Sequence, residues 1–132
     1  MKEVIEILMA PACGSLATVE NGKPRVRPFA FMFEEEGKFY FCTANNKEVY
    51  KQLVACPSIE YTKTTNDMHW LRMSGDIKFD EDLKHKEKCF QATPMLKDIY
   101  QSPENPIFKV FYLEHGVATI DSFSEARKVF KF

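Results

Sequence analysis

The sequence lacks the patterns that mark several common kinds of site. It has no Cys-x-x-Cys pair, no G-x-G-x-x-G turn and no Walker-type loop. These absences argue against a structural zinc site and against the usual nucleotide-binding turns. The three histidines, His69, His85 and His115, have no serine or carboxylate partner at the spacing of a catalytic triad. We therefore expect no metal site, and no side chain stands out as a catalytic residue.

The chain also has no charge excess of one sign and no long apolar run. It carries 18 lysines and arginines against 19 aspartates and glutamates, which gives a net charge of −1. No basic stripe predicts binding to nucleic acid, and no polybasic run or membrane-spanning segment predicts binding to a membrane. Glu3 and Glu6 interrupt the first apolar segment, which is therefore not a signal peptide. With cysteines in apolar surroundings, this predicts a cytoplasmic protein.

The composition is that of one soluble globular domain spanning residues 1–132, with 45% apolar and 28% charged residues. Twelve phenylalanines are many for this length. We expect part of this aromatic surface to be covered by a second subunit or by a flat ligand.

Turn signals and apolar spacing predict many short strands joined by hairpins, with helices inserted singly. The second strand is expected to run through Phe29, Phe31 and Phe33 and to be covered on both faces. This order favours an antiparallel barrel with a few short helices over a parallel sheet. The expected elements are, in chain order, a helix at 2–9, three strands within 14–44 joined at Asn21-Gly22 and Glu36-Gly37, a helix at 48–56, strands at 58–64 and 68–79, helices at 80–92 and 94–100, and two strand segments within 107–123 around His115-Gly116.

The stretch FCTANNKEVYKQL, residues 41–53, joins a strand to a helix and has two interpretations. Asn45 followed by Glu48 approximates a capping box, which is the purely structural interpretation. Lys47 is unusual in a first helical turn, where the helix dipole favours acidic residues. A lysine beside Thr43 is explained if an anion binds at the start of the helix. Both interpretations stay open from the local sequence.

Two further stretches have a structural and a functional interpretation. In PRVRPF, Arg25 and Arg27 alternate on one strand face and Pro28 removes a ladder donor, which indicates an edge strand or a ligand site. Trp70 and Arg72 lie on the polar face of an amphipathic strand. The tryptophan indicates an interface or ligand contact, or packing beneath a helix.

The order of these stretches resembles the pyridoxamine 5'-phosphate oxidase-like family of FMN-binding split β-barrels, and in particular its short branch. The resemblance covers nearly the whole chain, from GSLATVENGKPRVRPFAF through GKFYFCTANNKEVYKQL and WLRMSGDIKFDEDL to NPIFKVFYLEHGVATIDSF. It implies an α+β protein that is mainly β, with a six-stranded antiparallel split β-barrel and a few short helices. It also implies a homodimer with FMN sites at the subunit interface.

Matched by position, the resemblance assigns residues to the FMN site. Backbone groups near Pro28 and Phe29 would meet the flavin ring, and Trp70 and Arg72 would come from the other subunit to cover it. The phosphate and ribityl end would contact the remaining residues of the set, which are Arg25, Arg27, Thr43, Asn46 and Lys47.

The function implied by the resemblance is that of an FMN-dependent oxidoreductase acting on a small molecule. Lys47 stands alone where pyridoxamine phosphate oxidases carry a serine-arginine-lysine cluster, and SEARKVFKF lacks their C-terminal substrate motif. A substrate other than pyridoxamine phosphate is therefore expected. The alternatives are a flavin-binding or sensing module without turnover and a related barrel that binds deazaflavin or haem.

Overall fold

The computed structural model describes the whole chain, residues 1–132, as one antiparallel sheet with four short helices. The elements are α1 (Lys2–Met9), β1 (Gly14–Glu20), β2 (Lys23–Phe29), β3 (Phe33–Glu35), β4 (Lys38–Ala44), α2 (Glu48–Ala55), β5 (Ser58–Thr64), β6 (Trp70–Asp80), α3 (Leu83–Ala92), α4 (Leu96–Tyr100), β7 (Phe108–Asp121) and β8 (Lys128–Lys131).

The strands follow the order β2-β1-β5-β6-β7-β4-β3, and β8 pairs with β7 outside this path. The sheet curves but does not close, so the expected split-barrel fold class is confirmed. It has eight strands instead of the expected six. Compared with the segments expected along the chain, the second predicted strand divides in two and the two segments within 107–123 form the single strand β7. The C-terminal tail, whose sequence carried no readable pattern, adds β8.

That division occurs at Phe29, where β2 ends, so the prediction of one continuous strand through Phe33 is wrong. The chain stops pairing with β1 after Phe29 and crosses through residues 30–32 to the opposite edge of the sheet, where β3 pairs with β4. The hydroxyl of Tyr61 accepts from the Gly14 N–H at 3.0 Å and donates to the Phe29 carbonyl at 2.8 Å. Tyr61 thereby fixes the start of β1 and the end of β2 at the point where the chain changes edges.

Both predicted hairpin turns are confirmed by their backbone angles. Asn21 and Gly22 have φ of 53° and 76°, and Glu36 and Gly37 have φ of 51° and 79°. Two successive positive φ values are those of the two-residue type I′ turn, whose twist matches that of the flanking strands. By contrast, the prediction of two strand segments around His115-Gly116 is wrong, because β7 runs through both residues. A Cβ at Gly116 would collide with the Ser74 carbonyl of β6, so the close approach of the two strands requires glycine there.

The core consists of two apolar clusters on opposite faces of the sheet. The larger is rich in aromatic rings from β4, β5 and β7, with Phe29 packed against Phe41 and Phe111 at centroid distances of 6.2 and 5.9 Å. The smaller lies beneath α3 and α4. Among the phenylalanines only Phe123 is strongly exposed, at 86%. Phe39, Phe41, Phe108 and Phe111 are buried in the monomer's own core, and the other seven are half-buried. The expectation that a second subunit or a flat ligand covers part of this aromatic surface stays a prediction.

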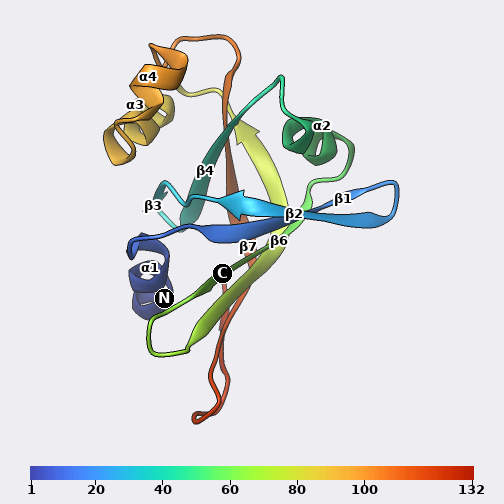
Figure 1. The fold of residues 1–132 in the computed structure, drawn as a ribbon, viewed down its shortest axis with the longest axis vertical. Coiled ribbons are helices and arrows are strands. Elements are labelled where there is room, and N and C mark those ends of the chain that lie inside the picture. Colours follow the sequence, from blue (N-terminus) through green and yellow to red (C-terminus); the bar gives the residue numbers. More distant parts are fainter.

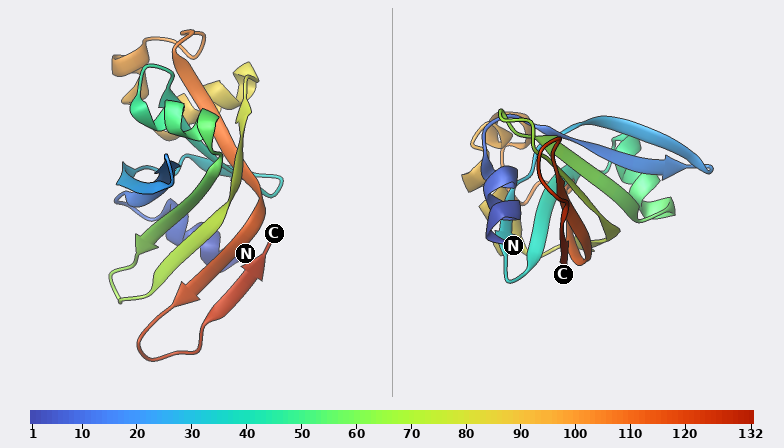
Figure 2. Two further views of the ribbon diagram at one scale, coloured as in Figure 1. Left: turned by 90° about the vertical axis from the view of Figure 1, so that its right-hand side faces the viewer. Right: turned by 90° about the horizontal axis from the view of Figure 1, so that it is seen from below.

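Three of the four helices gather at one end of the molecule (Figure 1). The upper end of β4 lies between α2 on one side and the α3–α4 pair on the other, whereas α1 lies apart from them, lower in the same view. Buried Lys63 of β5 donates to the carbonyls of Leu8 and Ala10 at 2.9 and 2.5 Å and so satisfies the C-terminus of α1. The chain termini lie side by side (Figure 2), and Lys128 pairs with Glu3 at 2.8 Å. No helix has the length and apolar character needed to cross a membrane.

We predict that Tyr61→Phe lowers the free energy of unfolding at neutral pH by about 1–3 kcal/mol, because it removes both hydrogen bonds at the change of edges. Urea unfolding measures this difference. Tyr112→Phe, at a half-buried ring of β7, is the matched control and should change the free energy by less than about 0.5 kcal/mol.

The same variant should alter the alkaline pH dependence of stability. Burial raises the pKa of Tyr61 from 10.0 to about 12. Between these values the folded protein holds the phenolic proton more tightly than the unfolded chain, so stability is complete below pH 10 and falls as the pH rises toward 12. Tyr61→Phe should lose stability less steeply over this range than the wild type, and equal slopes would contradict the assignment.

Candidate functional site

A cavity of about 330 Å³ lies at the end of β4, between α2 and α4. We call it the β4 cavity. Its floor and walls come from the end of β2, the end of β4, the start of α2 and the α4 region. The lining residues are Cys13, Arg27, Pro28, Phe29, Ala30, Met32, Cys42, Thr43, Lys47, Val49, Thr93, Met95, Leu96, Ile99 and Tyr100.

Five of the nine residues predicted for the FMN site line this one cavity: Arg27, Pro28, Phe29, Thr43 and Lys47. They come from two segments that do not pair with each other in the sheet, since β2 pairs with β1 and β4 pairs with β3 and β7. The change of edges after Phe29 is what brings the two segments together. A single chain therefore brings these five residues together, whereas the other four lie outside the cavity lining.

The hydroxyl of Thr43 is the most informative atom of the β4 cavity. Thr43 is only 3% exposed, and its Oγ1 is buried with no hydrogen-bond partner. A buried hydroxyl without a partner costs free energy, and such groups are rare in folded proteins. Because Thr43 also lines the cavity, a ligand there is positioned to supply the missing partner.

The start of α2 differs from the capping-box interpretation, which is wrong. The N-cap residue is Lys47 in extended conformation (φ −98°, ψ 150°), and no side chain caps the helix. Asn45 instead uses its backbone N–H to bond the Ile107 carbonyl at 2.9 Å, which places it in the turn before the helix. The N–H groups of Glu48 and Val49 have no backbone or side-chain acceptor. Such free N–H groups beside a lysine favour an anion.

Arg27 brings a second positive charge to the β4 cavity and is half-buried. Its guanidinium donates to the Leu16 carbonyl at 3.1 Å, the Thr18 hydroxyl at 2.9 Å and the Gln52 amide oxygen at 2.6 Å. All three acceptors are neutral. Burial lowers the pKa of Arg27, which remains a cation at neutral pH. No aspartate, glutamate or histidine lines the cavity, so neither cation there has a counter-charge in its walls.

The far wall of the β4 cavity is apolar and comes from residues that the sequence did not single out. Leu96 and Tyr100 are buried, whereas Met95 and Ile99 are 63% and 53% exposed at the cavity. An apolar pair spaced four residues apart on a short polar helix was the available signal. This wall suits an apolar or flat ligand surface. The side chains of Met95 and Ile99 remain exposed at the cavity and could be covered by another apolar surface.

Two thiols lie close together next to this wall. Cys42 lines the β4 cavity, and Cys89 of α3 is buried beside it. The neighbouring Cys42 thiol and burial raise the pKa of the Cys89 thiol far above its ordinary value. Cys89 therefore stays protonated and is a poor nucleophile.

Arg25 and Asn46 lie outside the lining of the β4 cavity. The edge-strand interpretation predicts two solvent-facing arginines. Arg25 is exposed and pairs with Glu20 at 3.0 Å, whereas Arg27 is half-buried. The edge position of β2 is confirmed by the strand order. Asn46 is exposed in the turn next to Lys47. Its side chain is near the cavity in sequence but does not line it.

Trp70 and Arg72 lie on β6, also outside the lining of the β4 cavity. The Trp70 ring packs against exposed Phe123 at a centroid distance of 5.2 Å. Arg72 pairs with Asp121 at 3.6 Å, and its buried Nε has no partner. A role for these two residues at the cofactor therefore needs a second copy of the chain and stays a prediction.

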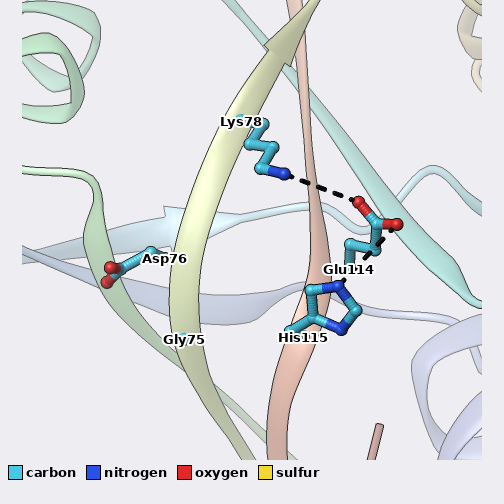
Figure 3. Close-up of a pocket in the computed structure, with 5 residues that line it drawn as sticks. All are labelled: Gly75, Asp76, Lys78, Glu114 and His115. Carbon is cyan, nitrogen blue, oxygen red and sulfur yellow. Dashed lines mark ion pairs between the residues drawn. The ribbon is translucent and has the colours of Figure 1, made fainter.

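A separate hollow of about 410 Å³ lies where β6 and β7 pair around the bulge after Gly75 (Figure 3). Lys78 points toward Glu114 at 3.8 Å, His115 lies 3.9 Å from the same carboxylate, and Asp76 points away on the other side of β6. No apolar side chain lines this hollow. Long, exposed ion pairs of this kind contribute little, and we interpret the hollow as solvated surface.

The β4 cavity therefore combines an apolar wall with an anion-attracting end. That end has the Thr43 hydroxyl, the Lys47 ammonium, the free N–H groups of α2 and the Arg27 guanidinium. An elongated ligand with a flat apolar body and a phosphate or carboxylate tail matches both ends. No group of three or more histidine, cysteine or acidic side chains is placed to hold a metal ion.

The fold is that of a split β-barrel protein, and its β4 cavity has one apolar and one positively charged end. A sequence profile described as pyridoxamine 5'-phosphate oxidase matches residues 1–115. The chain belongs to this family.

Solved structures show the same architecture. A NimC/NimA family protein from Clostridium acetobutylicum is 36% identical, with a TM-score of 0.92 over 100% of this chain and 92% of its own. General stress protein 26 from Bacillus anthracis (21% identity, TM-score 0.80, 99% and 98% coverage) shares the fold. So does a heme binding protein from Mycobacterium smegmatis (14%, 0.82, 98% and 56%). A search of curated proteins found no match.

We predict that Thr43→Val stabilises the ligand-free protein by about 1 kcal/mol, because it removes a buried hydroxyl that has no partner. Thr18→Val is the matched control, since Thr18 is equally buried but its hydroxyl donates to Gln52 at 2.6 Å. The Thr18→Val substitution should lower the free energy of unfolding by about 1–2 kcal/mol. Urea unfolding compares the two, and an equal loss in both would show that the Thr43 hydroxyl is satisfied within the protein.

Proposed function

We propose that this protein binds FMN in the β4 cavity and acts in the cytoplasm as an FMN-dependent oxidoreductase on a small molecule. The observation that carries the proposal is the buried, unpartnered Thr43 hydroxyl beside Lys47 at the uncapped start of α2. Membership of the family supports FMN as the anion. Four free cysteines fit a reducing compartment.

In this proposal the residues of the β4 cavity divide into two groups. Thr43, Lys47 and the N–H groups of Glu48 and Val49 hold the phosphate, and Asn46 can reach it from the adjoining exposed turn. Arg27 of β2, which is hydrogen-bonded to the Leu16 carbonyl of β1, adds a second positive charge. The apolar lining contacts the ring system and consists of Pro28, Phe29, Met95, Leu96 and Ile99.

When bound, FMN supplies hydride and electron transfer, and the protein supplies orientation and electrostatics. The charged groups fix one end of the ligand, so the opposite end takes a defined position against the apolar wall. No histidine or carboxylate lines the β4 cavity. In this proposal protons reach the site from solvent.

The proposal includes a homodimer in which a second copy completes the site. Met95 and Ile99 expose apolar surface at the cavity mouth, and a second copy would cover it. The partner subunit's Trp70 and the partner subunit's Arg72 would then close over the ligand. The Arg72 Nε, buried without an acceptor, would gain one there.

The second candidate is a flavin-binding or sensing module without turnover. The absence of any acidic or histidine side chain from the cavity lining favours it, because these side chains are the most frequent general acids and bases of enzymes. Bound flavin that neither NADH nor NADPH reduces would support this candidate. Haem has less support, since His69, His85 and His115 all lie outside the cavity.

The visible spectrum of the purified protein, and quenching of FMN fluorescence on titration, test FMN binding. We predict that Lys47→Ala weakens FMN binding about ten- to a hundred-fold, equivalent to about 1–3 kcal/mol for one charge-assisted phosphate contact. Lys51→Ala is the matched control, because Lys51 is exposed on the same helix and pairs with Glu48 at 3.3 Å. Colourless protein that fails to quench micromolar FMN would reject the cofactor.

The oligomeric state is tested separately by size-exclusion chromatography with light scattering. The chain has a mass of 15.4 kDa, so we predict a species of about twice this mass. Met95→Lys with Ile99→Lys should shift the protein toward the monomer, since burying two unpaired charges at an interface is unfavourable. A wild-type protein that remains monomeric at high concentration would contradict the shared site.

A further inference from the structure

The positive charge of Arg27 is held in place without being neutralised. The guanidinium has five N–H donors, and three hydrogen bonds connect it to Leu16, Thr18 and Gln52. Two donors therefore remain free on a half-buried cation that lines the β4 cavity. Buried arginines usually pair with a carboxylate, which offsets the cost of removing the charge from water. Here every acceptor is uncharged.

Gln52 is the uncharged acceptor that holds Arg27 without neutralising its positive charge. It lies in the middle of α2, is 6% exposed, and its Oε1 accepts from Arg27 at 2.6 Å and from the Thr18 hydroxyl at 2.6 Å. Thr18 in turn accepts from Arg27 at 2.9 Å, so the three side chains form a closed triangle. A glutamate has the same length and shape as glutamine. It would make the same contacts but would cancel the charge.

We propose that Gln52 is a specificity-determining residue of the cofactor site. It positions Arg27 with a neutral acceptor and thereby leaves the full positive charge of the guanidinium to attract the phosphate of FMN. This inference rests on the proposed function and extends it. It makes Gln52 responsible for part of the preference for FMN over riboflavin, which has the same ring system and ribityl chain without the phosphate.

The physical basis is the distance dependence of charge interactions in a poorly solvated site. A carboxylate in contact with Arg27 reduces the field that the guanidinium directs into the β4 cavity, and it also repels an incoming phosphate. Burial lowers the pKa of Arg27, and no acidic side chain opposes this effect, in agreement with a cation that has no counter-charge. The ring system of the ligand is uncharged and is not subject to the same effect.

The test is the substitution Gln52→Glu in the full-length protein, freed of flavin and titrated with FMN and with riboflavin by fluorescence quenching. We expect about ten-fold or greater weakening for FMN and a change of less than about two-fold for riboflavin. The difference in FMN affinity between the wild type and Gln52→Glu should become smaller at high salt, because screening weakens charge interactions. The melting temperature of the flavin-free variant should be unchanged or higher, since Arg27 gains a charged partner.

Val54→Glu is the matched control for net charge. Val54 lies two residues further along α2 and is 60% exposed, so a carboxylate there faces solvent. This control should change FMN binding by less than about three-fold. Gln52→Glu that binds FMN as tightly as the wild type, or that loses FMN and riboflavin equally, would overturn the inference.

Failure of the proposed function gives a different pattern from failure of this inference. Wild-type protein that binds neither flavin rejects FMN as the ligand. In that case the rise in melting temperature caused by inorganic phosphate, relative to chloride at equal ionic strength, tests the charge of Arg27 alone. A smaller rise in Gln52→Glu than in the wild type supports the part of the inference by which Gln52 leaves the charge of Arg27 available to an anion, and equal or absent rises in the two proteins overturn it.

Discussion

The hydroxyl of Tyr61 holds the sheet together at the point where it splits. It bonds the first residue of β1, Gly14, and the last residue of β2, Phe29, both far from Tyr61 in the sequence. Beyond Phe29 the chain crosses to the opposite edge of the sheet, where β3 pairs with β4. Arg27 and Pro28 come immediately before this crossing. The same contact that divides the sheet therefore places them against the end of β4 and creates the cavity.

The β4 cavity is also where the molecule departs from the usual rules of protein interiors. Thr43 buries a hydroxyl without a partner, α2 begins without a side-chain cap, and Arg27 is held by neutral acceptors only. Each feature costs stability in the ligand-free protein. Their concentration in one place has a common explanation, because an anionic ligand would satisfy all three. Local departures of this kind are expected at functional sites and not in the structural core.

Local chemistry allowed much of the fold to be predicted. Asn21-Gly22 and Glu36-Gly37 identify their turns because few residues tolerate two successive positive φ values. Pro28 identified an edge strand, since proline removes a ladder hydrogen bond. The capping box at Asn45 and the strand through Phe31 were wrong. Each was locally plausible, but the Asn45 N–H bonds the distant Ile107 and the chain turns away after Phe29.

The sequence by itself determined the helices, the turns, the mainly β class and the candidate residues around Thr43 and Lys47, because these depend on neighbours along the chain. Only the tertiary structure decided that Arg27 meets Gln52, that α4 supplies the apolar wall, and that the C-terminal tail forms β8. These features join residues from separate elements. Their partners are chosen by which strands pair and which surfaces are buried, and such choices leave no periodic signal in the sequence.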